Sequence, residues 1–401
     1  MQVERGGGVM PLETGPVWVT QDTSRRARLA SSGDSVSATI RLVRVAIDAT
    51  PLTVATGGIP RYTAELTGAL AAAFPDDTYF LISDQRPPSE SIDRLVHSHA
   101  NVRARLGASS FLEKRWWLIG LPKALARVRA DVFHGTDFSV PYVAAAPSVM
   151  TLHDLSPWLD TGWHHNADRV RARTPYLVRL GLATRIITHS EAVRRQAINW
   201  FGISPARVVA VPLAASSHFR PQPSREAGEA YFLYAGTLEP RKNLGMLVDA
   251  LKAVREKQPV RLVLAGRRRA DFVQPGEWPG LELRGEVPDA DLPGLYSGAV
   301  AVLYPSLYEG FGLPVLEAMS CGAAVIASRD AAISEVAGGA AIQLDARDTR
   351  AWAQAMLAAV ENPPALATWR ERAVERSRQF SWPRTAAGTR KVYEEAINHF
   401  A

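Results

Sequence analysis

Two carboxylates occupy positions of this chain where their spacing suits ligand binding. Glu309 and Glu317 lie eight residues apart in segment 299–328, in which a strand-like run precedes a glycine-containing loop and a short predicted helix. The glycines and Pro314 keep Glu309 in the loop and place Glu317 in the first turns of the helix. Open α/β sheets bind ligands at the carboxyl ends of their strands, and a helix N-terminus offers free amides to an anion. Both carboxylates are therefore expected to accept hydrogen bonds from hydroxyl groups around a bound anion.

Arg241 and Lys242 form a second candidate site upstream. They follow a strand-like run that ends at Gly236, and we expect them at the start of a helix. Two fixed cations beside helix amides suit a diphosphate, whose charge they would screen when it departs as a leaving group. A solvated basic turn is the alternative interpretation of this pair alone. The combination with the two carboxylates favours a ligand site.

His153 closes a short apolar run at the ligand side of the first predicted sheet and is followed by Asp154. A histidine near its ordinary pKa can transfer protons at neutral pH. A single histidine after a strand is more often a structural hydrogen-bonding residue, but the context here favours a functional role. His134 is similarly placed, and we interpret it as structural.

Alternating strand-like and helical segments must position these residues. Short apolar runs that end at polar or glycine residues recur over residues 41–215 and again up to about residue 340, with amphipathic segments between them. This alternation predicts an α/β fold with parallel sheets covered by helices. The Pro-, Ser- and Ala-rich stretch 212–230 is typical of a linker. We expect a disordered extension over residues 1–40 and two domains, over 41–220 and 221–380.

The composition is that of a globular protein with room for two domains, since 47% of the 401 residues are apolar and 21% are charged. Residues 41–220 carry 21 basic and 14 acidic side chains, and residues 221–401 carry 21 and 22, so the net charge of +6 belongs to the first half. This excess indicates an anionic partner there. Cys321 stands alone, so no internal disulfide is expected, and we predict a cytoplasmic location.

The segments around Arg241 and Glu309 resemble the donor-binding signatures of glycosyltransferase family 4, retaining enzymes of the GT-B fold that use nucleotide sugars. The Glu-x7-Glu pattern, the GFGLP core, the PRKN turn, the Thr-Gly-Gly-Ile loop and the TLHDLS strand occur in the family's order. The resemblance covers about residues 41–398 and is similar in detail to bacterial mannosyl- and rhamnosyltransferases that build O-antigen and exopolysaccharide chains. It implies two Rossmann-like, doubly wound domains facing a central cleft, with a closing helix over 381–401 that packs back on the first domain.

Carried over residue by residue, the resemblance assigns a role to each matching position. Glu317 would hydrogen-bond the ribose hydroxyls, and Glu309 and His153 would face the reacting sugar. The remaining donor-binding residues would be the Gly312 and Leu313 amides, Arg241, Lys242, Gly57 and Gly58 at the diphosphate and Val287 at the base. Many relatives have an arginine where this chain has Thr237, so the phosphate charge would rest more heavily on the two cations.

The function implied is retaining transfer of a hexose, with GDP-mannose as the expected donor, to a lipid-linked or oligosaccharide acceptor. The acceptor hydroxyl would attack on the same face while the departing diphosphate removes its proton, so neither a protein nucleophile nor a cofactor is expected. A nucleotide-sugar epimerase and a phosphorylase of the same fold are alternatives, as is a non-catalytic sugar-nucleotide-binding scaffold. The missing G-x-G-x-x-G motif disfavours an NAD-dependent dehydrogenase.

Three partner classes remain to be considered. Asp289 and Asp291 have a spacing that binds a metal in another glycosyltransferase fold, but they precede a predicted helix and fit capping, so no catalytic metal is expected.

Segment 111–130 joins two tryptophans to five cations, which fits either an anionic membrane surface, at the inner face of the plasma membrane, or an ordinary amphipathic helix. No nucleic-acid-binding signature accompanies the basic charge, so no nucleic-acid partner is expected.

Overall fold

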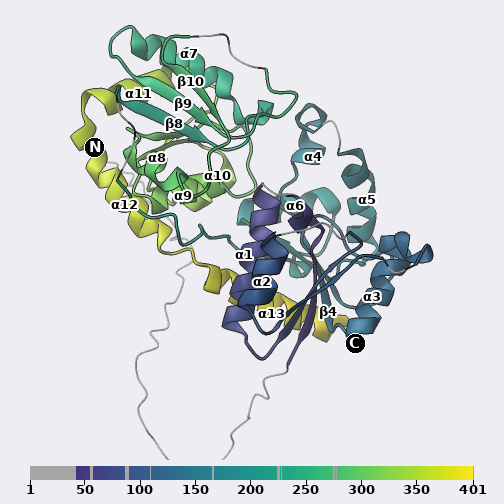
Figure 1. Cartoon of the computed structure of the whole chain (residues 1–401). Helices are drawn as coiled ribbons and strands as arrows, with labels where there is room; N and C mark the ends of the chain where they lie inside the picture. The colour runs from purple at the N-terminus through teal and green to yellow at the C-terminus, as the bar shows by residue number, and fades with distance from the viewer. Residues whose placement is uncertain are drawn as a thin grey trace, which may run out of the picture. The chain divides into compact units, whose positions relative to one another are not determined.

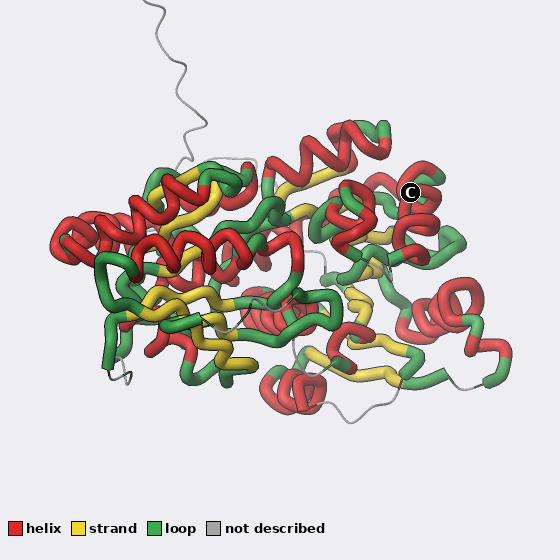
Figure 2. Tube along the Cα trace, turned by 90° about the horizontal axis from the view of Figure 1, so that it is seen from above, coloured by secondary structure: helices red, strands yellow, loops and turns green. Residues whose placement is uncertain are grey.

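The computed structural model describes residues 42–54, 57–85, 90–108, 110–164, 167–223, 226, 228–273, 276 and 278–400. Residues Leu42–Ala401 form one compact unit. The extension expected over residues 1–40 lies outside the described residues. Helices cover both sides of the strands of the described part, as Figure 2 shows.

The first sheet has seven parallel strands in the order β3-β2-β1-β4-β5-β6-β7. The strands are β1 (Arg44–Asp48), β2 (Thr78–Ser83), β3 (Val102–Leu106), β4 (Val132–Gly135), β5 (Ser148–Thr151), β6 (Arg185–Thr188) and β7 (Val208–Ala210). The helices between them are α1 (Gly58–Ala73), α2 (Glu90–Ser98), α3 (Leu121–Val128), α4 (Ser156–Leu159), α5 (Asp168–Arg179) and α6 (Glu191–Phe201). The strand order reverses between β1 and β4, which is the point where doubly wound sheets bind ligands.

The second sheet has six parallel strands in the order β10-β9-β8-β11-β12-β13 and reverses between β8 and β11. The strands are β8 (Tyr231–Ala235), β9 (Arg261–Ala265), β10 (Leu281–Gly285), β11 (Val302–Tyr304), β12 (Val325–Ser328) and β13 (Ile342–Leu344). The helices are α7 (Leu244–Arg255), α8 (Leu292–Gly298), α9 (Leu313–Ser320), α10 (Ala331–Ala337), α11 (Thr349–Glu361), α12 (Ala367–Ser377) and α13 (Trp382–Phe400). The predicted α/β fold with two doubly wound parallel sheets is confirmed (Figure 1).

Three strands escaped the sequence analysis, namely β3, β7 and β13. Each lies at an edge of its sheet. Edge strands are often short and expose one flank to solvent, and β7 and β13 have only three residues each, too few to show a strand pattern. Strand β3 reads VRARL, with exposed arginines alternating with apolar residues.

Helix α13 ends the chain against the first sheet, beside α1 and strands β4 to β6 (Figure 1). Arg390 of this helix forms a buried ion pair with Asp77, with Nε 2.5 Å from Oδ2. The Tyr393 hydroxyl lies 2.7 Å from Nδ1 of His134 on β4. The last helix is therefore anchored on the layer formed by the first half of the chain.

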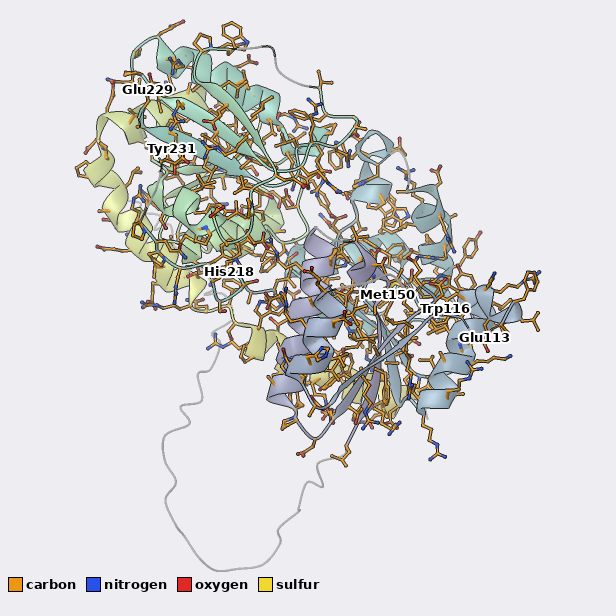
Figure 3. All side chains as sticks on the ribbon, viewed as in Figure 1. Glu113, Trp116, Met150, His218, Glu229 and Tyr231 are labelled. Atoms are coloured by element: carbon orange, nitrogen blue, oxygen red, sulfur yellow. The ribbon has the colours of Figure 1, made fainter. Side chains whose placement is uncertain are left out.

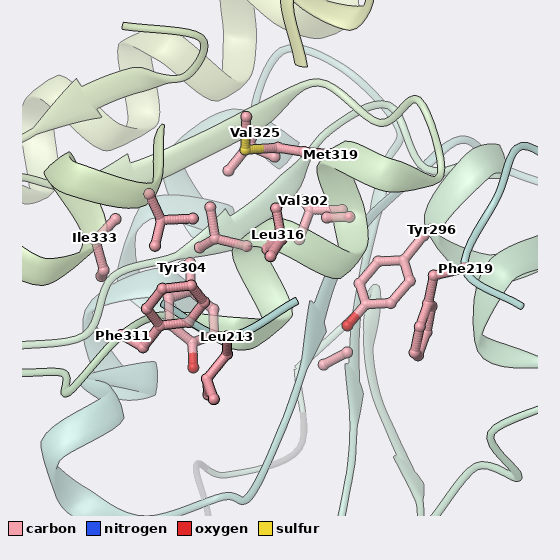
Figure 4. Packing of buried hydrophobic residues seen from close by; sticks show 14 of the residues in the cluster. Leu213, Phe219, Tyr296, Val302, Tyr304, Phe311, Leu316, Met319, Val325 and Ile333 are labelled. Atoms are coloured by element: carbon pink, nitrogen blue, oxygen red, sulfur yellow. The ribbon is translucent and has the colours of Figure 1, made fainter. Parts of the chain in front are cut away.

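One buried apolar cluster includes residues of both sheets. Figure 4 shows part of it, in which Phe219 lies beside Tyr296, their ring centroids 6.0 Å apart. A second cluster belongs to the first sheet and includes Phe133, Trp116 and Phe201. Burial of the shared cluster stabilises the arrangement of the two sheets, because separating them would expose its apolar surface to water.

Candidate functional site

All ten predicted site residues line one cavity of about 2100 Å³. They come from segments that follow the carboxyl ends of strands in both sheets, where ligands bind in open α/β folds. The residues are Gly57, Gly58, His153, Arg241, Lys242, Val287, Glu309, Gly312, Leu313 and Glu317. The structure therefore brings together side chains that are up to 260 positions apart in the chain.

Glu309 lies buried between the two predicted cations. Its Oε1 is 2.5 Å from Nζ of Lys242, and its Oε2 is 3.2 Å from Nη1 of Arg241. Burial alone would raise the pKa of Glu309, yet the Lys242 ammonium and the Arg241 guanidinium together lower it to about 2. Glu309 is therefore ionised at neutral pH, and both cations are already paired with a protein carboxylate.

A second carboxylate extends this cluster. Glu239 pairs with two arginines: its Oε1 lies 2.6 Å from Nε of Arg241, and its Oε2 accepts from Nη1 of Arg269 at 2.7 Å. Positive and negative side chains therefore alternate in space, in the order Arg269, Glu239, Arg241, Glu309 and Lys242. Each ion has a neighbour of opposite charge, which offsets the free-energy cost of removing charges from water. Glu239 and Arg269 were missed by the sequence analysis, although both also line the cavity.

The two cations lie just before α7 and not in its first turn, which corrects the prediction that they begin this helix. Arg241 and Lys242 belong to a short 3-10 turn, Pro240–Lys242. Asn243 follows in the left-handed conformation, with φ 57°, and its Nδ2 donates to the Ala346 carbonyl at 2.6 Å. Helix α7 begins only at Leu244. Asn is one of the few residues that adopt this conformation readily, and it ends the turn before the helix.

Glu317 lies on α9 and is also buried. Its Oε1 accepts from Nη1 of Arg61 at 2.6 Å, and its Oε2 accepts from the Tyr296 hydroxyl at 3.2 Å. Burial raises the pKa of Glu317 to about 7, although the Arg61 guanidinium acts in the opposite direction. The carboxylate expected to meet the ribose hydroxyls is thus held by an arginine of the first sheet's helix α1.

Arg61 is the main site residue that the sequence analysis missed. Its second nitrogen, Nη2, lies 2.5 Å from Oδ1 of Asp289. The sequence does contain an indication of its role, because Arg61 lies in the first turns of α1, three residues after the predicted donor-binding residue Gly58. The capping interpretation of the two aspartates is wrong, because Asp289 pairs with Arg61 and Asp291 at the N-cap of α8 makes no capping hydrogen bond through its side chain.

The loop before α9 presents backbone amides to the cavity. Gly312 is the N-cap of the helix and has φ 95°, a conformation that strongly favours glycine, and Leu313 and Pro314 open the first turn. The amides of Gly312 and Leu313 are among those at a helix N-terminus without an intrahelical acceptor. The predicted placement of Pro314 and of the glycine loop is confirmed.

The same loop packs against the first sheet's elements. The Tyr308 hydroxyl accepts from the Leu155 amide at 2.9 Å and donates to Oε1 of Gln196 at 2.8 Å. Ser190 Oγ donates to the Gly310 carbonyl at 2.8 Å and, as the N-cap of α6, also accepts from the Val193 amide. These contacts position Glu309, which lies between Tyr308 and Gly310.

His153 has both ring nitrogens engaged with protein atoms. Nε2 lies 2.8 Å from the Thr136 carbonyl oxygen, and Nδ1 lies 3.1 Å from Nε2 of His189. His189 is buried and was missed by the sequence analysis. His134 lies between the Tyr393 and Thr151 hydroxyls at 2.7 and 2.8 Å, which agrees with its structural interpretation.

Within the ranges that the structure describes, no three histidine, cysteine or acidic side chains converge as a metal site would require. Over those same ranges, no helix has the length and apolar character needed to cross a bilayer. The expectation that no metal takes part in the reaction stays a prediction.

Comparison with known proteins identifies the family. A model described as Glycosyltransferase Family 4 matches residues 56–215, and one described as Glycosyl transferases group 1 matches residues 229–362. The O-antigen chain mannosyltransferase B of Escherichia coli is 33% identical over 370 residues, covering 84% of this chain and 96% of that relative. The chain belongs to glycosyltransferase family 4. The serotype-specific mannosyltransferase WbdA of Escherichia coli is 27% identical over 345 residues, 78% of this chain and 40% of the relative.

Solved structures show that this family 4 glycosyltransferase has the GT-B fold. Sucrose-phosphate synthase from Thermosynechococcus elongatus aligns with a TM-score of 0.67 and 19% identity, covering 90% of this chain and 100% of that one. Anabaena HepE in complex with UDP-glucose aligns with a TM-score of 0.66 and 19% identity, covering 88% and 98%. The fold class and the family resemblance inferred from the sequence are confirmed.

Glu317 should give the stability of this glycosyltransferase a pH dependence of defined sign. Its folded pKa of about 7 lies above the ordinary value of 4.5, so between these values the folded state binds more protons than the unfolded state. The free energy of unfolding is therefore expected to fall by on the order of 3 kcal/mol as the pH rises across that range. Glu317→Gln should remove this contribution.

Chemical denaturation across that pH range measures the effect. Glu375→Gln on α12 is the matched control, because that carboxylate is 72% exposed and should leave the slope unchanged. Equal pH slopes for the wild type and Glu317→Gln would contradict the prediction.

Proposed function

We propose that this family 4 glycosyltransferase transfers mannose from GDP-mannose, with retention, to a growing lipid-linked O-antigen or exopolysaccharide glycan. The observation that carries the proposal is the convergence of Glu317, Glu309 and two buried cations in one cavity with the α9 amides. The choice of mannose is supported by the 33% identity to the O-antigen chain mannosyltransferase B. Epimerase, phosphorylase and scaffold functions remain the alternatives to be tested.

In the proposed reaction, the donor diphosphate binds at the α9 N-terminus and shares Arg241 and Lys242 with Glu309. The cations stabilise the charge that grows on the departing diphosphate, since fixed donors in a site shielded from water act strongly on developing charge. Glu309 is ionised and accepts hydrogen bonds from sugar hydroxyls. The acceptor hydroxyl attacks from the face that the diphosphate leaves, and its proton passes to the diphosphate. We propose no protein nucleophile, cofactor or catalytic metal for this step.

The donor can be identified by thermal unfolding with GDP, UDP, ADP and dTDP. A ligand that binds the folded state at about 100 times its Kd stabilises it by about 2.7 kcal/mol. GDP is expected to give the largest increase in the unfolding temperature. A preference for UDP would remove the GDP-mannose assignment.

Incubation of donor with and without acceptor separates the proposal from its alternatives. We expect release of nucleoside diphosphate to depend on acceptor, with the anomeric configuration of the sugar kept. Conversion of donor alone would indicate an epimerase, and dependence on inorganic phosphate would indicate a phosphorylase. Binding without turnover across an acceptor panel would indicate a scaffold.

We further propose that the acceptor is presented at an anionic membrane, at the inner cytoplasmic face. Phe111 and Leu112 are 83% and 58% exposed, beside the exposed cations Lys114 and Arg115, whereas Trp116 is buried. Figure 3 shows Trp116 close to Glu113 in the region of α3. The segment is not one amphipathic helix, since a 3-10 turn (Leu112–Lys114) and a π-helical turn (Trp116–Gly120) precede α3.

Vesicle sedimentation tests the membrane proposal. The full chain is expected to bind vesicles that contain anionic lipid, and binding should weaken with added salt because exposed charges are screened. Phe111→Ser should reduce this binding, and Val273→Ser, at an 86% exposed residue before β10, is the matched control. Equal binding to zwitterionic vesicles would contradict an electrostatic contribution.

A further inference from the structure

The hydrogen bonds of His153 and His189 need more protons than two neutral imidazole rings carry. The pair makes three contacts in a row: the Thr136 carbonyl with Nε2 of His153, Nδ1 of His153 with Nε2 of His189, and Nδ1 of His189 with the Val211 carbonyl. The distances are 2.8, 3.1 and 3.3 Å. A carbonyl oxygen only accepts, so both terminal contacts need a proton on the ring nitrogen. The central contact needs a third proton, whereas two neutral imidazoles carry only two.

His134 differs from the pair because neither of its partners is a carbonyl oxygen. Its partners are the hydroxyls of Tyr393 and Thr151, each of which can donate or accept. A neutral ring therefore satisfies both of its contacts. Burial, helped by the charge of His153, lowers the pKa of His134 to about 3, which agrees with a neutral ring.

The surroundings indicate which ring of the pair carries the extra proton. Burial lowers the pKa of His189 well below its ordinary value, and a charge on His153 lowers it further. Burial raises the pKa of Asp137, while His153 and then Arg173 act in the opposite direction. A neutral His189 that carries its proton on Nδ1 can donate to Val211 and accept from His153 through Nε2. Both nitrogens of His153 then carry protons.

We infer that His153 is an imidazolium cation held between the Thr136 carbonyl and a neutral His189, which makes His189 a positioning residue that keeps a positive charge in the cavity. The titratable and charged groups beside the pair are Tyr62 of α1 and His134 of β4, together with Asp137, on which His153 and Arg173 of α5 act. Asp154 follows His153 in the chain. The Tyr62 ring makes T-shaped contacts with both imidazoles, with its centroid 5.3 Å from that of His153 and 4.9 Å from that of His189. Asp154 instead accepts from the Ser156 amide and hydroxyl.

The inference deepens the proposed function and rests on it where it concerns transfer. Because both of its nitrogens already donate to protein atoms, His153 has no lone pair with which to take a proton from the acceptor. It would act as a fixed cation beside the departing diphosphate, and the acceptor proton would remain with that diphosphate.

Nitrogen NMR of the full chain with ¹⁵N-labelled histidine tests the charge directly, with His153→Gln used to assign the signals. At neutral pH, both ring nitrogens of His153 are expected to show the shifts of protonated nitrogens. His189→Leu removes the acceptor and should leave His153 neutral and lower kcat by at least about tenfold. KM for the donor should change little.

His189→Gln is the matched conservative variant. Its amide oxygen can accept from His153 and its NH₂ can donate to Val211, so the charge and most of kcat should return. A neutral His153 in the wild type, or a Gln variant that behaves as the Leu variant does, would overturn the inference. If no donor were turned over, the proposed function would fail, while the ring shifts would still decide the charge.

Discussion

Lys242→Ala is expected to lower kcat for sugar transfer by about 10²–10³-fold, the usual effect of removing one fixed donor that stabilises transition-state charge. Lys242 is buried, and its ammonium lies 2.5 Å from Glu309 and 3.1 Å from the Tyr304 hydroxyl. Once it is removed, Arg241, with Nη1 3.2 Å from Oε2 of Glu309, remains as the cation paired with that carboxylate. The same change should reduce stability by about 3–5 kcal/mol, because it leaves a buried charge partly uncompensated.

Steady-state kinetics with the donor found by thermal unfolding measures the effect. Lys252→Ala is the matched control, since Lys252 lies on α7 with a 36% exposed side chain and pairs with the exposed Asp249. That variant should keep wild-type kcat and KM. If Lys242→Ala folds and retains the transfer rate and donor affinity, the assignment of the diphosphate site is wrong.

Gly310→Ala is expected to abolish most of the transfer activity through a steric effect. A Cβ at this position would lie 2.2 Å from the His153 carbonyl oxygen and 3.0 Å from Cβ of Asp154. The loop must therefore move away from His153, and it carries Glu309, the neighbouring residue. A displacement of about 1 Å in a positioned group can cost about 10²-fold in rate. The forced repacking should also reduce stability by about 1–3 kcal/mol.

Gly245→Ala is the control for this change. Gly245 lies in the first turn of α7, and a Cβ there meets no atom within 4 Å. Because alanine favours helix over glycine by up to about 1 kcal/mol, this variant should be as stable as the wild type or more so. Activity and melting temperature of the two variants are compared in parallel. Wild-type activity in Gly310→Ala would show that the contact with His153 does not position the loop.

The two predictions differ in what they test. Lys242→Ala removes a charge from the cavity and leaves the backbone in place. Gly310→Ala leaves every charged group present and changes where they lie. A loss of activity in both would mean that the site needs its cations and also the position that the loop gives Glu309.

Much of this protein could be predicted from local sequence. Strands such as β8 and β11 are apolar runs of the right length, and Gly312 and Pro314 mark a turn and a helix start wherever they occur in that order. These patterns depend on neighbours within a few residues, so they can be recognised in the sequence without knowledge of the tertiary structure. Edge strand β3 and the 3-10 turn at Arg241 were missed because charged side chains and a single left-handed Asn243 weaken those signals.

The sequence by itself determined the parallel α/β class, because that class follows from patterns confined to single strands and loops, and the family resemblance indicated ten of the residues that line the cavity. Only the tertiary structure decided their partners. Arg61 meets Glu317 across 256 positions, and Glu309 meets Lys242 across 67. His153 meets His189 because β5 and β6 are neighbours in the sheet. Such contacts depend on strand order and on how the two sheets pack, and a local pattern carries no information about either.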